Sequence, residues 1–183
     1  MKTFTTLFDA NYLDKAIALY ESLNRFLDDY KLYCLCLDDG AFNKITEIND
    51  KRLIPLHIKD ELYDDPDFKT LVKHNESVPV GEVAKKGKIA GLSDFHFALG
   101  SFFTNHIMVK EQPEDILYID SDIIFYHSPE LIYDSMVGNS IGLILHRHVA
   151  IGKEVGGYNV GIVYFRNDET GRGCLKWWRF HQL

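Results

Sequence analysis

The chain has 183 residues, of which 46% are hydrophobic and 26% charged, and its formal net charge is −7 at pH 7. This length suits one packed domain, and the acidic balance argues against a general nucleic-acid binder, which needs a basic face. No apolar run approaches the length of a membrane-spanning helix, and the N-terminal residues lack the apolar core and cleavage site of a signal peptide. We therefore expect a cytosolic protein.

Strand and helix signals alternate through the first third of the chain. Residues 2–8 predict a strand, and residues 12–27 carry apolar side chains at helical spacing. A second strand is predicted over 31–37, a short helix over 41–49 and a third strand over 52–58. This rhythm is typical of right-handed parallel crossovers, so we predict an α/β fold whose mostly parallel sheet is flanked by helices.

The rest of the chain continues the same alternation after an irregular stretch over 59–88, where we expect a loop with short helices. The remaining predicted elements are a helix over 92–109, the apolar run 116–125, a short helix after Ser128-Pro129-Glu130, strands over 140–145 and 159–165, and a helix over 168–183.

Two carboxylates interrupt the apolar run 116–125. Asp120 and Asp122 are one residue apart, and the apolar sequence resumes after them. Unpaired buried charge is strongly disfavoured, so such a pair persists where a cation or a reacting group balances it. Acids at positions i and i+2 of an extended segment point to the same side and can converge on one hard cation, which prefers oxygen ligands. The alternative is a solvated turn between two strands.

Three stretches of the chain together resemble a known family. They are Asp9-Ala10-Asn11-Tyr12 after the first strand, the Asp-Ser-Asp (DxD) motif at 120–122, and Tyr158-Asn159-Val160-Gly161 further downstream. In order and spacing they resemble nucleotide-sugar glycosyltransferases of the GT-A fold, a Rossmann-like α/β fold. The resemblance is strongest to family-8-like bacterial enzymes that build lipopolysaccharide or other cell-surface polysaccharide. It covers nearly all of residues 1–180.

The resemblance implies a role for each matched residue. The nucleotide would be bound by Leu7, Phe8, Asp9, Asn11, Tyr12 and Asp120. The metal ion, Mn²⁺ or Mg²⁺, would be held by Asp120 and Asp122. The donor sugar would lie beside Tyr158, Asn159, Val160 and Gly161. No catalytic residue can be named.

The resemblance also implies a reaction. A sugar would move from a nucleoside-diphosphate donor, a UDP-sugar by analogy, to a glycan or lipid-linked acceptor with retention of anomeric configuration. The metal ion would stabilise the negative charge that grows on the departing nucleoside diphosphate. We expect one catalytic domain over residues 1–183, cytoplasmic or peripheral at the inner membrane face. The family pattern continues into a later C-terminal segment with a further metal-binding histidine, which this chain does not include.

Two other functions are compatible with the DxD motif. One is a truncated or non-catalytic module that binds a nucleotide sugar or a metal. The other is a haloacid-dehalogenase-like phosphohydrolase, in which Asp120 would be the nucleophile. That chemistry needs a downstream lysine and a second acidic cluster, and no paired acids of this kind follow Asp122.

Structural roles are alternatives for many of these residues. Asp9 and Asn11 are good helix caps, and Asn159 with Gly161 could begin a strand that carries a bulge. Three further groups could serve either the site or only the surface and the core: Lys85, Lys86 and Lys88; His146, Arg147 and His148; and Trp177 with Trp178.

Overall fold

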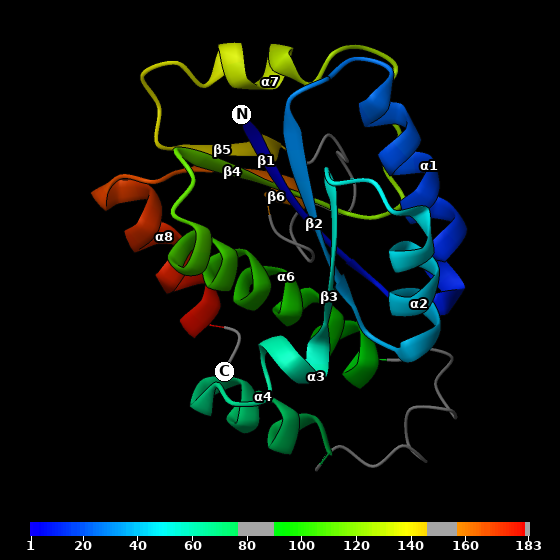
Figure 1. Ribbon diagram of the computed structural model, residues 1–183. Helices are drawn as coiled ribbons and strands as arrows, with labels where there is room; N and C mark the ends of the chain where they lie inside the picture. Colours follow the sequence, from blue (N-terminus) through cyan, green and yellow to red (C-terminus); the bar gives the residue numbers. More distant parts are fainter. Residues whose placement is uncertain (77–89, 146–156, 182–183) are drawn as a thin grey trace.

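The computed structural model describes residues 1–76, 90–145 and 157–181. In this part of the chain a six-stranded sheet runs through the centre, and helices cover both of its faces (Figure 1). The strand order is β3-β2-β1-β4-β6-β5, in which the first four strands are parallel and β6 is antiparallel to both neighbours. The predicted α/β class with a mostly parallel sheet is confirmed. None of the described helices is both long and apolar enough to cross a membrane.

The elements follow the predicted alternation. The strands are β1 (Lys2–Phe8), β2 (Tyr30–Cys36), β3 (Leu53–His57), β4 (Asp115–Ile119), β5 (Ile141–Leu145) and β6 (Tyr158–Arg166). The helices are the 3₁₀ turn η1 (Ala10–Tyr12), α1 (Leu13–Asn24), α2 (Asp39–Ile48), α3 (Ile58–Glu61), α4 (Pro66–Glu76), α6 (Ala90–Glu111), α7 (Glu130–Ser135) and α8 (Glu169–Phe180).

Two apolar layers enclose the sheet. Residues of α1, α2 and α7 pack on one face, and residues of α3, α4, α6 and α8 pack on the other (Figure 1). Because side chains alternate along a strand, β4 contributes Leu117 and Ile119 to the first layer and Ile116 and Tyr118 to the second. The end of β4 is therefore anchored on both faces of the sheet.

The acid-bearing strand is shorter than the apolar run 116–125 suggests. β4 ends at Ile119, and the two acids that follow lie in a turn. Asp120 is half-buried, whereas the side chain of Asp122 is 49% exposed. The prediction of two charges inside a buried strand is therefore wrong, because the strand ends at Ile119 and the second acid is exposed.

The apolar segment after this turn packs on α1 instead of extending the sheet. Phe125 is buried, and its backbone amide donates to Oγ of Ser22 on α1 at 3.1 Å. The Ser22 hydroxyl in turn donates to the carbonyl of Leu19 at 2.7 Å. Since this bond joins α1 to the segment directly after Asp122, it positions the second acid beside α1.

The last helix joins the second apolar layer through Leu175, which is fully buried, and through one of its two tryptophans. Trp178 stacks on Phe165 with ring centroids 6.0 Å apart, whereas Trp177 is 60% exposed. The helix begins where the Asp168 carboxylate accepts the amide of Gly171 at 2.8 Å. The packing role is therefore confirmed for Trp178 but not for Trp177.

Gly171→Ala should destabilise the protein. A Cβ atom at this buried position would collide with the backbone carbonyl oxygen of Arg166, and overpacking of this kind costs about 1–3 kcal/mol. Chemical denaturation should show a loss of this size in the free energy of unfolding. Gly173→Ala is the matched control on the same helix, because its Cβ would meet nothing within 4 Å and alanine favours helix by up to about 1 kcal/mol. Equal effects of the two substitutions would contradict this packing.

Candidate functional site

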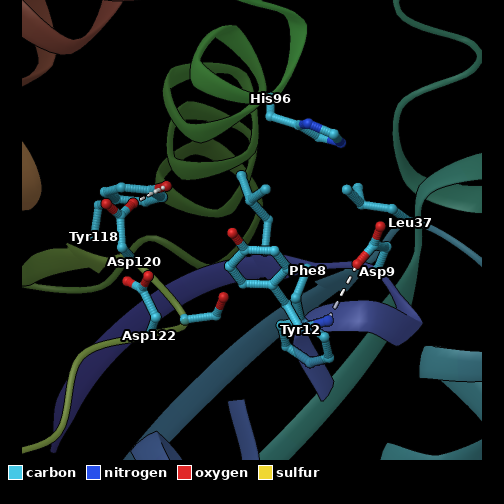
Figure 2. Close-up of a pocket in the computed structure, with 10 residues that line it drawn as sticks. Phe8, Asp9, Tyr12, Leu37, His96, Tyr118, Asp120 and Asp122 are labelled. Carbon is cyan, nitrogen blue, oxygen red and sulfur yellow. Dashed lines mark hydrogen bonds between the residues drawn. The ribbon is translucent and has the colours of Figure 1, made fainter. Parts of the chain in front are cut away.

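A cleft of about 350 Å³ opens at the carboxyl ends of the central strands (Figure 2). The strand order reverses at β1, because β2 and β3 lie on one side of it and β4 lies on the other. Open α/β sheets bind ligands at such a switch point, outside the carboxyl ends of the strands. The residues that line the cleft are Leu7, Phe8, Asp9, Tyr12, Leu37, His96, Tyr118, Asp120, Ser121 and Asp122.

The turn after β1 builds one wall of the cleft. Oδ1 of Asp9 accepts the backbone amides of Asn11 and Tyr12 at 3.0 and 3.2 Å, and so closes the 3₁₀ turn η1. The Asp38 carboxylate, at the start of α2, accepts the amide of Ala10 at 2.9 Å. This bond is the main reason that the pKa of Asp38 is lowered. The turn is thus held by two carboxylates, one of its own and one from the end of the neighbouring strand.

Asp120 is held through both its backbone and its side chain. Its amide donates to the carbonyl of Gly161 on β6 at 2.8 Å, and the Tyr118 hydroxyl donates to its Oδ1 at 2.8 Å (Figure 2). Burial raises the pKa of Asp120, the bond from Tyr118 acts in the opposite direction, and the charge of Asp122 adds to the rise. A raised pKa means that the ionised carboxylate lacks compensating positive charge.

Asp122 lies beside helix α1. Its Oδ2 is 3.8 Å from Nζ of Lys15, and both side chains are 49% exposed. The same ammonium group lies 3.9 Å from the centroid of the Tyr12 ring. The two acids therefore differ in environment, since Asp120 is half-buried beside a tyrosine and Asp122 faces a lysine in solvent.

Strand β6 brings a glycine against Asp120. The register between β5 and β6 shifts at Leu143 and Ile144, so that β6 bulges between Asn159 and residue 163. A Cβ atom at Gly161 would lie 3.1 Å from Oδ2 of Asp120 and 3.0 Å from Oδ1 of Asn159, which accepts the Gly161 amide at 2.8 Å. A side chain here would press on the carboxylate, so glycine suits the position.

The acid pair suits a hard divalent cation as part of a coordination shell. Carboxylate oxygens are the donors that Mn²⁺ and Mg²⁺ prefer, and Mg²⁺ is often held by one or two carboxylates together with substrate phosphates and water. Burial and the charge of Asp122 both raise the pKa of Asp120, and a bound cation would oppose this rise. Within the described residues no group of three or more His, Cys, Asp and Glu side chains could hold a metal ion. Asp120 and Asp122 would therefore need further ligands.

Comparison with known sequences gives distant relatives. No family model matches the chain. It is 24% identical over 191 residues to the uncharacterized protein YfnF of Bacillus subtilis strain 168, and 22% identical over 181 residues to YfnD of the same organism. Each match covers 96% of this chain but only 56% and 53% of the relative. The chain thus spans about half the length of the curated relatives it matches.

Solved structures reveal the fold. Mouse xyloside xylosyltransferase 1 superposes with a TM-score of 0.61 at 14% identity, over 100% of this chain and 72% of that chain. The galactosyltransferase LgtC, solved with donor and acceptor sugar analogues, gives 0.55 at 15% identity over 98% and 60%. The bifunctional glycosyltransferase WbbM gives 0.56 at 13% identity over 96% and 34%. The chain has the GT-A fold.

The cleft is lined by six of the eleven residues predicted to bind the nucleotide, the donor sugar or the metal ion. Those that line it are Leu7, Phe8, Asp9, Tyr12, Asp120 and Asp122. Asn11 is not among the lining residues, and its side-chain amide donates to Oδ2 of Asp9 at 3.0 Å. The predicted donor-sugar residues Tyr158, Asn159, Val160 and Gly161 lie on β6 outside the lining, with Gly161 against Asp120.

Structural roles account for part of this set. The capping role of Asp9 and the bulge at Asn159 and Gly161 are confirmed. The roles of these residues toward a nucleotide or sugar stay predictions. Two predicted clusters lie outside the described residues: Lys85, Lys86 and Lys88, and His146, Arg147 and His148.

Four residues at the GT-A cleft were not singled out from the sequence. Tyr118 stands two residues before Asp120, so strand periodicity could have placed both side chains on one side. Lys15 follows Tyr12 by three residues, a spacing that brings side chains together on a helix. His96 lies on an apolar helix and projects toward the cleft in Figure 2, and Asp38 is the N-cap of α2. No sequence signal distinguishes these last two from ordinary surface and turn residues.

Asp120→Asn should raise the melting temperature near pH 7 when divalent cations are removed by a chelator. Because the folded-state pKa of Asp120 is raised, protonation of this carboxyl stabilises the fold, and that stabilisation is lost as pH rises through the folded pKa. Asparagine removes the charge yet keeps an oxygen that can accept the Tyr118 hydroxyl.

Thermal melts should show that the increase in melting temperature of Asp120→Asn over wild type shrinks as pH falls toward about 4, where carboxyls become protonated. Asp28→Asn, an exposed change before β2, is the control and should give no such gain. A gain in Asp120→Asn that does not depend on pH would contradict the assigned cause.

Proposed function

We propose that this chain is the donor-binding domain of a glycosyltransferase, which moves a sugar from a nucleoside diphosphate to a glycan or lipid-linked acceptor. The observation that carries the proposal is the cleft itself. In a GT-A fold it joins Asp120 and Asp122 to the aromatic and acidic residues at the end of β1. The structural neighbours named above are glycosyltransferases, which supports the same class of reaction here.

The wall formed by β1 and η1 suits a nucleoside. Tyr12 lines the cleft and is 45% exposed, so its ring can offer an apolar face to a base. Asp9 lies beside it and, with Leu7, Phe8 and Asn11, would bind base and ribose. The cleft volume of about 350 Å³ lies within the usual range of small-molecule sites.

The acidic wall suits a diphosphate only through a cation. Asp9, Asp120 and Asp122 put three carboxylates in the described lining, which contains no lysine or arginine. We propose that Asp120 and Asp122 hold Mn²⁺ or Mg²⁺, which when bound stabilises the negative charge that develops on the departing nucleoside diphosphate. Tyr118 keeps the Asp120 carboxylate in place for this task.

The finer assignments rest on the sequence resemblance. They are a family-8-like enzyme, a UDP-sugar donor, retention of configuration, and an acceptor in lipopolysaccharide or another surface polysaccharide. The donor sugar would lie beside Tyr158, Asn159, Val160 and Gly161 on β6, of which Gly161 lies against Asp120. A cytoplasmic enzyme, peripheral at the inner membrane face, completes the proposal.

A non-catalytic nucleotide-sugar module is the second candidate. It is favoured by one observation: no group of three or more His, Cys, Asp and Glu side chains among the described residues could hold a metal ion, so Asp120 and Asp122 alone would form an incomplete coordination shell. Hydrolysis of donor sugars in the presence of Mn²⁺ separates the two candidates. Binding of UDP without any turnover would favour the module. Rapid, Asp120-dependent hydrolysis of an aryl phosphate would instead support a phosphohydrolase.

Asp122→Ala should abolish metal-dependent binding of UDP while leaving the fold intact. The side chain is 49% exposed, so its removal should change the free energy of unfolding by no more than about 0.5 kcal/mol. Calorimetric titration of UDP in the presence of Mn²⁺ should show a loss of at least about tenfold, a difference of about 1.4 kcal/mol.

Wild-type protein titrated with UDP in a chelator should lose affinity in the same way. Asp28→Ala provides a control for the removal of one exposed acid far from the cleft. Unchanged affinity in Asp122→Ala would rule out the metal assignment.

A thermal-shift screen of nucleotide sugars with and without Mn²⁺ would identify the donor, because a ligand that binds the folded state raises its stability.

A further inference from the structure

Lys15 connects an acid and an aromatic residue of the cleft. Its ammonium group lies 3.8 Å from Oδ2 of Asp122 and 3.9 Å from the centroid of the Tyr12 ring. Among the ion pairs of the described residues, this one alone includes an acid that lines the cleft. Lys15 is therefore the lysine placed to act on the acid pair.

The position of Lys15 conflicts with a cation on the same carboxylate. A metal ion that binds Asp122 would share its carboxylate charge with the ammonium group, and its two positive charges would repel that group at short range. Binding of the cation therefore weakens the pair between Lys15 and Asp122 and places a like charge beside the ammonium group.

We infer that Lys15 competes with the divalent cation for Asp122 and so sets the cation affinity of the cleft. The inference rests on the proposed function, because it takes Asp122 to be a metal ligand. Lys15 acts on the cation through Asp122 and by charge repulsion, without ligating it.

The competition also couples the cation to the nucleotide. Once Asp122 is taken by the cation, Lys15 stands beside the cleft without its acidic partner. A diphosphate brings the negative charge that relieves the repulsion between the ammonium group and the cation. The cation and the nucleoside diphosphate therefore each raise the affinity for the other, as linkage requires.

The expected effect of Lys15 on the cation affinity is modest, because the Lys15–Asp122 pair is about half exposed. Each side chain is 49% exposed, and exposed ion pairs shift an equilibrium by only about a few-fold. Relief of repulsion on a doubly charged ion adds to this, so removal of the ammonium group should tighten cation binding roughly three- to tenfold. The effect should shrink in concentrated salt, which screens exposed charges.

The test is a titration with Mn²⁺ alone, in which electron paramagnetic resonance measures the free ion. Lys15→Met keeps the length of the side chain and loses its charge, so its Kd for Mn²⁺ should fall roughly three- to tenfold. Lys15→Arg keeps the charge and should bind close to wild type. Lys44→Met is the matched control, because Lys44 pairs with Glu47 on α2 and its loss changes net charge equally. Addition of UDP should enhance Mn²⁺ affinity less in Lys15→Met than in wild type.

The possible results separate the two proposals. If Asp122→Asn loses Mn²⁺ binding but Lys15→Met binds Mn²⁺ like wild type, the role of Lys15 is wrong and the metal site stands. If wild type does not bind Mn²⁺, or Asp122→Asn binds it equally well, both proposals are wrong. If Lys44→Met increases the affinity for Mn²⁺ as much as Lys15→Met does, the increase reflects net charge alone and overturns the role of Lys15.

Discussion

The half-buried carboxylate of Asp120 is the constraint on which the rest of the site depends. Parallel pairing of β1 with β4 brings the ends of both strands to one edge of the sheet, and Asp120 is the first residue past that edge. Its burial disfavours the charged form, so a neighbouring hydroxyl from Tyr118 and a backbone bond to Gly161 hold it in place. The surrounding elements pack so that this residue keeps one position.

The turn after β4 separates the environments of the two acids. In a continuous strand, residues at i and i+2 stay roughly 7 Å apart and share one face. Because the strand stops at Ile119, Asp122 moves out of the ladder toward α1, where it meets Lys15. One acid is thus hydrogen-bonded and partly desolvated, and the other is exposed and paired with a lysine.

Local sequence patterns predicted the elements well where their signals were strong. Strand β1 and the alternation through β3 followed from apolar periodicity, and helix α1 from its spacing of apolar residues. At the acid turn the apolar pattern predicts a strand, because apolar residues continue after Asp122. In the folded chain their burial comes from α1, through Phe125 and its bond to Ser22. A pattern of apolar residues shows that a segment is buried but does not show against what.

By itself the sequence determined the α/β class, the order of the elements and the three motif stretches. These depend on local periodicity and on residue types, both of which are visible in the sequence itself. Only the tertiary structure decided that the end of β1 and Asp120 line one cleft at the switch point, that Gly161 lies against Asp120, and that Lys15 reaches Asp122. Such contacts join residues as many as about a hundred positions apart, and they arise from strand order and helix packing rather than from any local preference.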